Sequence, residues 1–212
     1  MGGEHARMTD DTKNIMDVIL TIVGMIGAAT VFFHTLREWQ ESQRWKRAEQ
    51  LDKFVERFDH DEQLRLACVI LDWSDRRITY KNRDLTLTNN DVLLALRIHT
   101  DIDADADCKF PGEQPTIRDA FDAVLAFFAR LELALTFKLI DLEPAKRHFD
   151  YWLQRLLTMD QHSDPTRVLG EHSPEAMMRR YINKYGSEDS VERLRGYFQT
   201  GVVSRGRSRG RG

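Results

Sequence analysis

The sequence predicts an all-α protein in which an N-terminal transmembrane helix continues into a stalk and is followed by a small helical bundle. Three observations favour this class: a charge-free apolar stretch near the start, apolar residues at helical spacing over most of the rest, and almost no strand-like alternation. A chain of 212 residues suits one domain plus an anchor. We therefore expect a short extracytoplasmic segment (1–17), the transmembrane helix (18–36), a juxtamembrane stalk helix (37–58), a helical cytoplasmic domain (59–198) and a disordered Arg/Gly-rich tail (199–212).

The anchor is predicted from residues 18–36, VILTIVGMIGAATVFFHTL, which contain no formally charged side chain. At about 1.5 Å per residue this stretch matches a hydrocarbon layer of roughly 30 Å. A cleaved signal peptide would begin with basic residues and end at small ones, whereas acidic residues precede this stretch and Phe32 and Phe33 lie near its end. A buried helix of a soluble protein would contain more polar residues than three threonines and a histidine.

Basic residues decide the expected orientation. More lysines and arginines follow the stretch closely than precede it, which places the following domain in the cytoplasm. We therefore expect a single-pass protein of the inner (cytoplasmic) membrane, with the N-terminus outside. Two indole rings beyond the stretch favour the headgroup layer. The candidate membrane-interface residues are Arg37, Trp39, Arg44, Trp45, Lys46 and Arg47.

The stalk is predicted because residues 37–58 are rich in helix formers and contain neither glycine nor proline. Apolar residues at helical spacing appear only in its second half, at Leu51, Phe54, Val55 and Phe58. The stalk should enter the core of the domain there.

The first part of the domain should contain two short helices. Residues 59–61 interrupt the stalk, and a helix then follows with an apolar face that includes Cys68. Residues 75–87 are polar and are expected to form a loop with at most a brief extended piece. Thr88, with Asp91 three residues later, predicts a capped helix start.

The second part should hold the central helix. Residues 100–115 are expected to be irregular, and Thr116 with Asp119 predicts a capped start after them. Spacings of three and four then define one buried stripe: Ile117, Phe121, Val124, Phe128, Leu131 and Leu135. Pro144 suits the first turn of the next helix, which should pack back on the central helix as a hairpin.

Two further helices are expected near the C-terminus. Ser173 followed by Pro174 is typical of a helix start, and Gly186 is typical of a helix end. A last helix should cover residues 188–198. The tail beyond it has no packing face.

Several segments together carry a resemblance: FFHTLREWQESQRWKRAEQ, IRDAFDAVLAFFARLELALTFKLI, YWLQRL and RRYINKYG. In these segments and in their order along the chain, over most of residues 15–186, the chain resembles an uncharacterised family of short bacterial single-pass membrane proteins. The resemblance implies an N-terminal membrane helix and a helical cytoplasmic domain. It implies no catalytic residues, and the arginine-rich tail is not part of the pattern.

No catalytic or cofactor motif is recognisable, since GxSxG, GxGxxG, HExxH and the phosphate-binding loop are missing from the sequence. We therefore expect no cofactor. Alternate carboxylates at Asp101, Asp103, Asp105 and Asp107 are compatible with calcium, but the positions that need glycine and a bidentate glutamate do not fit, which favours a solvated acidic loop. An enzyme would need a site assembled from distant residues, for which Asp72, Asp75, Arg76 and Arg77 are candidates.

Two features suggest partners. Thr21, Gly24 and Ala28 share one face of the predicted membrane helix and are candidate helix-association residues, so a homo-oligomer is one expectation. The last eight residues carry four arginines and no acidic residue. The rest of the chain therefore has a formal net charge of −7, against −3 for the whole chain. The candidate phosphate or lipid contacts are Arg205, Arg207, Arg209 and Arg211.

The sequence favours a membrane-tethered, non-enzymatic interaction or regulatory protein. Its expected partners are the lipid bilayer and a cytoplasmic protein, while nucleic acid is expected only as a weak contact of the basic tail. Two alternatives stay open: a membrane-bound enzyme with an unrecognised site, and a membrane-acting effector or defence protein.

Overall fold

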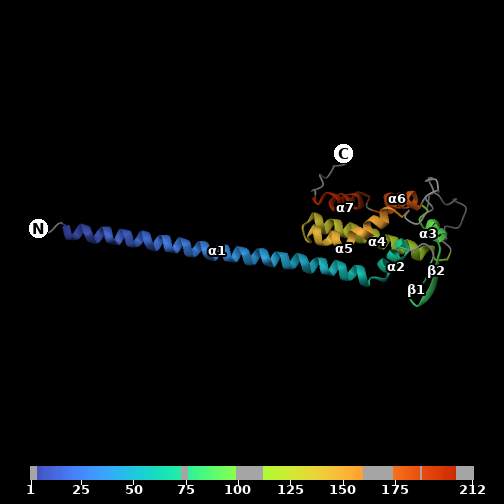
Figure 1. The fold of residues 1–212 in the computed structure, drawn as a ribbon, viewed down its shortest axis with the longest axis horizontal. Coiled ribbons are helices and arrows are strands. Elements are labelled where there is room, and N and C mark those ends of the chain that lie inside the picture. Colours follow the sequence, from blue (N-terminus) through green and yellow to red (C-terminus); the bar gives the residue numbers. More distant parts are fainter. Residues whose placement is uncertain (1–3, 73–75, 99–111, 160–173, 187, 204–212) are drawn as a thin grey trace. The chain divides into compact units, whose positions relative to one another are not determined.

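The computed structural model describes residues 4–72, 76–98, 112–159, 174–186 and 188–203. Within them the chain forms seven helices and one two-stranded sheet (Figure 1), so the expected all-α class is confirmed with a small β-hairpin added. The elements are α1 (Glu4–His60), α2 (Glu62–Asp72), β1 (Arg76–Tyr80), β2 (Arg83–Leu87), α3 (Asn89–Ala95), α4 (Gln114–Thr136), α5 (Leu142–Leu157), α6 (Pro174–Tyr185) and α7 (Glu188–Thr200).

The chain divides into two compact units, Met1–Lys46 and Arg47–Gly212, and we call the second unit the body. Helix α1 contributes residues to both units, because it continues without a break to His60. The body therefore includes the second half of the predicted stalk.

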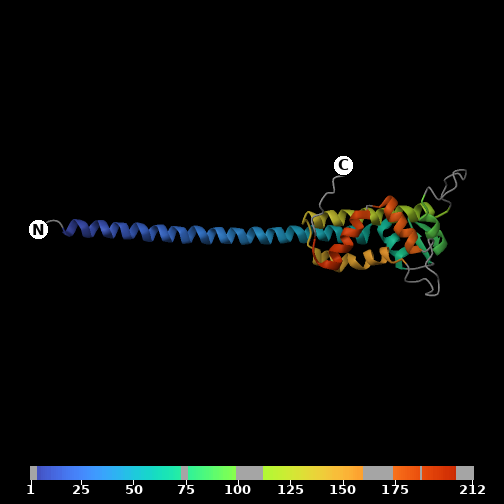
Figure 2. The same ribbon diagram turned by 90° about the horizontal axis from the view of Figure 1, so that it is seen from above.

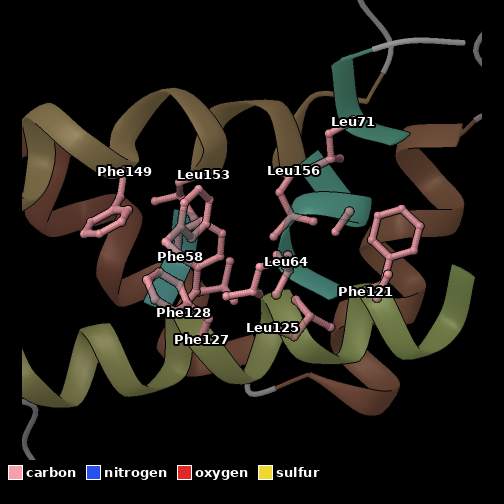
Figure 3. Packing of buried hydrophobic residues seen from close by; sticks show 14 of the residues in the cluster. Phe58, Leu64, Leu71, Phe121, Leu125, Phe127, Phe128, Phe149, Leu153 and Leu156 are labelled. Atoms are coloured by element: carbon pink, nitrogen blue, oxygen red, sulfur yellow. The ribbon is translucent and has the colours of Figure 1, made fainter. Parts of the chain in front are cut away.

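That second half of α1 is part of the hydrophobic core, as predicted. Leu51 and Phe58 are buried, and Phe54 and Val55 pack against the same core. The Phe58 ring lies 5.0 Å from Phe127 and 5.4 Å from Phe149, measured between ring centroids (Figure 3). Helix α2 then begins under an Asp61 cap, whose carboxylate accepts hydrogen bonds from the backbone N–H groups of Gln63 and Leu64.

Helix α4 is the central helix of the body. All six residues of its predicted stripe are buried, because the three–four spacing keeps them on one face. It packs against α2, α3 and α7. The predicted start at Thr116 is wrong: α4 begins at Gln114, after Glu113, with Pro115 in its first turn. Proline has no N–H to leave unsatisfied there, so the helix extends back past the expected cap.

Helix α5 buries Phe149, Leu153 and Leu156 in the core. A short turn joins it to α4, but its main neighbours are α2, α6 and α7. Figure 2 shows α2 and the C-terminal end of α1 between α4 and α5. These two segments therefore separate the arms of the predicted hairpin. The two helices still meet at Phe127 and Phe149, whose rings are 5.2 Å apart.

Residues 75–87 were expected to be mostly loop, and this is corrected by the hairpin of β1 and β2. The strands pair antiparallel, and Tyr80 opposes Arg83. Lys81 and Asn82 between them have φ values of 48° and 61°, as a two-residue type I′ turn requires. Leu85 and Leu87 are buried, so one face of β2 joins the core.

The capping box of Thr88 and Asp91 on α3 is confirmed by hydrogen bonds in both directions. Gly186 follows α6 as predicted. A Cβ atom there would lie 2.8 Å from the carbonyl oxygen of Ile182, so a larger residue would clash. Helix α7 is two residues longer than expected, and Val203 packs against the core within the segment expected to be a disordered tail.

Candidate functional site

Helix α1 carries the candidate membrane anchor. In the part of the chain that the structure describes, it is the one helix long and apolar enough to cross a membrane, with a mean hydropathy of 2.2 over its most apolar window. No part of that window is buried by the protein. Residues 15–36 are exposed on all sides, including Leu20, Val31 and Phe33. An apolar surface of this extent is unfavourable in water and needs a cover.

The hydroxyl groups of this segment are satisfied inside the helix. Thr21 donates to the carbonyl oxygen of Asp17 at 2.7 Å, and Thr30 donates to that of Ile26 at 2.8 Å. A hydrocarbon environment requires such internal hydrogen bonds because it offers no water.

Thr21, Gly24 and Ala28 are all exposed on α1. A Cβ atom built on Gly24 would meet nothing within 4 Å, so this position is open to the close approach of another helix. Because the Thr21 proton already bonds to Asp17, its oxygen could only accept a bond from a neighbouring helix. Association through this face stays a prediction.

Five of the six candidate interface residues are exposed, and one is not. Trp39 and Trp45 project outward, and Arg37 forms an exposed pair with Glu41 at 3.4 Å. Arg44 and Lys46 are exposed as well. The side chain of Arg47 is only 33% exposed and lies 3.2 Å from the Asp141 carboxylate of the body. The structure therefore gives Arg47 a partner within the body.

A buried polar cluster joins α4 to α7. Glu132 is 1% exposed, and its carboxylate accepts hydrogen bonds from Arg193 Nε at 3.0 Å and Thr136 Oγ1 at 2.8 Å. The Tyr197 hydroxyl also donates to it, at 3.3 Å. The carboxylate raises the pKa of the Arg193 guanidinium by accepting its hydrogen bond. Three side chains on two helices thus satisfy one buried charge.

A second cluster joins α2 to α5. Asp72 accepts hydrogen bonds from Arg155 Nε at 3.1 Å and from the Tyr151 hydroxyl. The bond to Asp72 raises the pKa of Tyr151, since ionisation would break it. Arg155 Nη2 also donates to the Asp72 carbonyl oxygen at 3.2 Å, so it helps close the end of α2.

A third cluster links α3, α4 and α6. Arg118 Nη1 donates to the carbonyl oxygens of Ala95 at 2.7 Å and Arg97 at 2.8 Å. The Arg118 guanidinium lies 5.0 Å from the ring centroid of Tyr181, whose hydroxyl donates to Asp122 at 2.6 Å. Burial, followed by this bond, raises the pKa of Tyr181. The sequence analysis did not predict these three clusters. The signal that indicates them is the presence of charged residues beside the apolar stripes of the helices.

Of the four residues proposed for an assembled catalytic site, the structure describes the side chains of only Asp72 and Arg77. Asp72 pairs with Arg155, whereas Arg77 pairs with Asp84 at 2.9 Å on the hairpin. Asp75, the side chain of Arg76, the acidic run at 101–107 and the tail arginines at 205–211 lie outside the described residues. Among the described residues, no group of three or more His, Cys, Asp or Glu side chains is placed to hold a metal ion.

Among the open grooves on the described surface of the body, two are lined mainly by residues of α1, α2, α5 and β1. The larger one, about 350 Å³, lies between α2 and β1 and is lined by charged and apolar side chains, including Arg65, Val69 and Lys81. The smaller one, about 180 Å³, lies between α1 and α5 beside Arg47 and His148. No described residue of the three polar clusters lines the larger groove.

Comparison with protein-family models, with curated proteins and with solved structures finds no match for the chain. The exposed apolar segment of α1 and the surface of the body are therefore the features that bear on function.

Proposed function

We propose that the chain is a single-pass membrane protein whose span tethers a non-enzymatic interaction domain to the cytoplasmic side of the membrane. One observation carries the proposal: a single unbroken helix is apolar and uncovered over residues 18–36, and it contributes Leu51 and Phe58 to the core of the body. The helix is thus both an anchor and a structural part of the domain.

The distribution of apolar residues favours a bilayer as the cover. A partner helix would cover one stripe of α1, whereas exposed apolar side chains occur at consecutive positions, such as Val18 to Leu20 and Val31 to Phe33. A helix that is apolar all round suits a lipid environment or the interior of a large protein. The resemblance of the sequence to bacterial single-pass membrane proteins supports the same proposal.

The polar chemistry of the body supports an interaction role. Its most buried charged residues, Glu132, Arg155 and Arg118, each bond to another helix or to the end of one. These groups stabilise the fold. The outer surfaces of the helices are the part of the body offered to a partner.

Membrane extraction tests the tether. The full-length protein should remain in the membrane pellet after alkaline carbonate treatment, because hydrocarbon burial rather than charge holds it. Replacing Val23 and Ile26 by arginine should release it, since each central arginine costs about 2.5 to 3.5 kcal/mol on insertion scales. Gln50→Arg, on the exposed face of α1 in the body, is the matched control. Recovery of the parent protein in the carbonate supernatant would refute the tether.

Orientation is tested separately. Reporter domains fused after Gly212 should be active only when the reporter requires the cytoplasm, because basic residues follow the span. Joint replacement of Arg37, Arg44 and Lys46 by glutamine should weaken this preference. Reporter activity on the outer side of the membrane for the parent sequence would reverse the proposed topology.

A further inference from the structure

Three chain segments meet at one end of the body. The ion pair of Arg47 with Asp141 places the α4–α5 turn beside the part of α1 where the body begins. Helices α4 and α7 run parallel, since Glu132 contacts Arg193 and, one turn later, Thr136 contacts Tyr197 at 3.2 Å. The end of α7 therefore lies near the same turn, as both ribbon views show (Figures 1 and 2). We call residues 137–141 and 200–203 the tip.

Exposed apolar side chains gather at the tip. Phe137 is 69% exposed, Leu139 55% and Val202 64%, and Leu133 is exposed one turn before Phe137. Within the described part of the body only two other large hydrophobic residues are exposed, Tyr151 and Tyr185. Both of these carry a hydroxyl group, so the exposed aliphatic and phenyl surface is concentrated at the tip.

The backbone holds these side chains outward. Lys138 has a φ of 56°, its N–H donates to Leu135, and the N–H of Leu139 donates to Ala134 at 2.8 Å. This is the Schellman pattern that ends many helices, with a lysine at the left-handed position where glycine is usual. The pattern leaves Phe137 and Leu139 in solvent and places a cation between them, while Ile140 turns into the core.

We propose that the tip docks on the anionic surface of the same membrane that α1 crosses, with Phe137, Leu139 and Val202 entering the headgroup layer. This inference rests on the proposed span. Lys138, between Phe137 and Leu139, supplies the charge that attracts lipid phosphates. An apolar insertion beside a cation combines hydrophobic burial with electrostatic attraction to anionic lipids, the two contributions that set the strength of interfacial binding.

The chain length allows this contact. Only ten residues, 37–46, separate the end of the predicted span from Arg47, and as helix they rise about 15 Å. A headgroup layer adds about 5 to 8 Å on each side of the hydrocarbon. Membrane helices tilt by about 20° on average and up to about 40°. Arg47, which contacts the tip through Asp141, thus lies within about 15 Å of the predicted span along the chain.

A lipid surface fits the tip better than a second copy of the chain does. A stable dimer buries about 800 Å² on each partner, with a continuous apolar centre. Three or four apolar side chains at a helix end, beside one lysine, are too few for that. They match the small apolar insertions by which peripheral proteins contact a bilayer.

Site-directed spin labelling of the full chain tests the inference. In a variant with Cys68→Ala and Cys108→Ser, a nitroxide at Leu139→Cys or Val202→Cys reports the tip. A nitroxide at Asn90→Cys reports α3, which lies at the opposite end of the body from the tip (Figure 1). The protein is placed in phosphatidylcholine vesicles with and without phosphatidylglycerol. With the anionic lipid, we expect the accessibility of the tip labels to oxygen to rise relative to their accessibility to a water-soluble nickel chelate. The Asn90 label should remain in water, and adding Lys138→Glu should reduce the shift at Val202.

A fourth label, at Ile26→Cys, separates this inference from the proposed function. If it reports hydrocarbon while both tip labels match the Asn90 label, the tip inference is overturned and the tether stands. If the Ile26 label itself reports water, the span fails and the tip inference with it. Spin–spin broadening at the tip that disappears on dilution with unlabelled protein would show a second copy there, which also overturns the inference.

Discussion

Glu132 is a charged residue in the most buried face of the central helix. Removing a carboxylate from water is costly unless charge and hydrogen bonds replace the lost hydration. Arg193 supplies the charge, and Thr136 and Tyr197 supply further donors. The cluster therefore specifies how α7 lies along α4, because the donors meet the carboxylate only in one register.

Replacing Arg193 by methionine tests this cluster while keeping most of the alkyl side chain. Glu132 would remain buried without its cation, and we expect a loss of about 2 to 3 kcal/mol in the free energy of unfolding, below the value for a fully buried pair because Arg193 is 38% exposed. Arg195→Met is the control on the same helix. Its pair with Glu192 is solvent-exposed, so it should cost under about 1 kcal/mol. Urea denaturation followed by near-ultraviolet circular dichroism measures both, and equal losses would contradict the role of the cluster.

The Cys68 thiol predicts an alkaline sensitivity. Burial on α2, with smaller contributions from Asp72 and Asp59, raises its pKa from 9.0 to about 12. A raised pKa in the folded state means that the neutral thiol contributes stability below about pH 9, and that this contribution is lost as the pH rises toward 12. The free energy of unfolding of the parent should therefore fall more than that of Cys68→Ala between about pH 8 and pH 10. Parallel pH profiles would show that the thiol is not the cause.

Helix α1 follows two sequence patterns along one continuous backbone. Its first part is apolar on every side and uncovered, and its last part is amphipathic and buried on one face. The change occurs without a glycine or proline between residues 37 and 58, so backbone hydrogen bonding is not interrupted. Leu51 and Phe58, in the last part of the helix, are buried in the core of the body.

Phe58→Ala tests whether the body depends on α1. The ring packs among Phe127, Phe149 and Trp152, so its loss leaves a cavity, and we expect a cost of about 3 to 5 kcal/mol. Phe137→Ala removes the same atoms from an exposed site. It should change the free energy of unfolding of the detergent-solubilised protein by less than about 0.5 kcal/mol. Thermal denaturation of both variants gives the comparison. A small effect of Phe58→Ala would mean that the core closes without the stalk.

At the scale of the whole molecule, tethering and tip docking would restrict the body to one side of a membrane and to few orientations. A partner would then meet the faces of α5, α6 and the hairpin more readily than the tip. Pairing of two predicted spans would be a second route by which the protein is organised in the membrane. Gly24 and Ala28 favour it because they leave one face of the span free of bulky side chains.

That route predicts a change in a membrane dimerisation assay on residues 15–36. Gly24→Ile and Ala28→Ile should lower the dimer signal, since a bulky side chain prevents close backbone approach. Ile26→Leu, on another face, should leave the signal unchanged. The same signal from the parent and all three variants would mean that the anchor does not pair through Thr21, Gly24 and Ala28.

Much of the architecture follows from local patterns. The apolar length of residues 18–36, the stripe on α4, the Thr88 capping box and the end of α6 before Gly186 each depend on residues within a few turns of one another. Helix periodicity and capping are short-range effects, so the sequence alone predicts them.

Tertiary structure decided what depends on distant neighbours. It opened the expected pairing of α4 and α5, because the end of α1 and α2 pack between them. It moved the start of α4 to Gln114 and formed a hairpin where a loop was expected, since a buried face for Leu85 and Leu87 exists only once the core has assembled. It also gave Arg47 and Glu132 their partners. The sequence by itself determined the long apolar helix and most of the other helices, because these are set by local spacing, while the polar clusters and the tip required the packed helices that bring remote residues together.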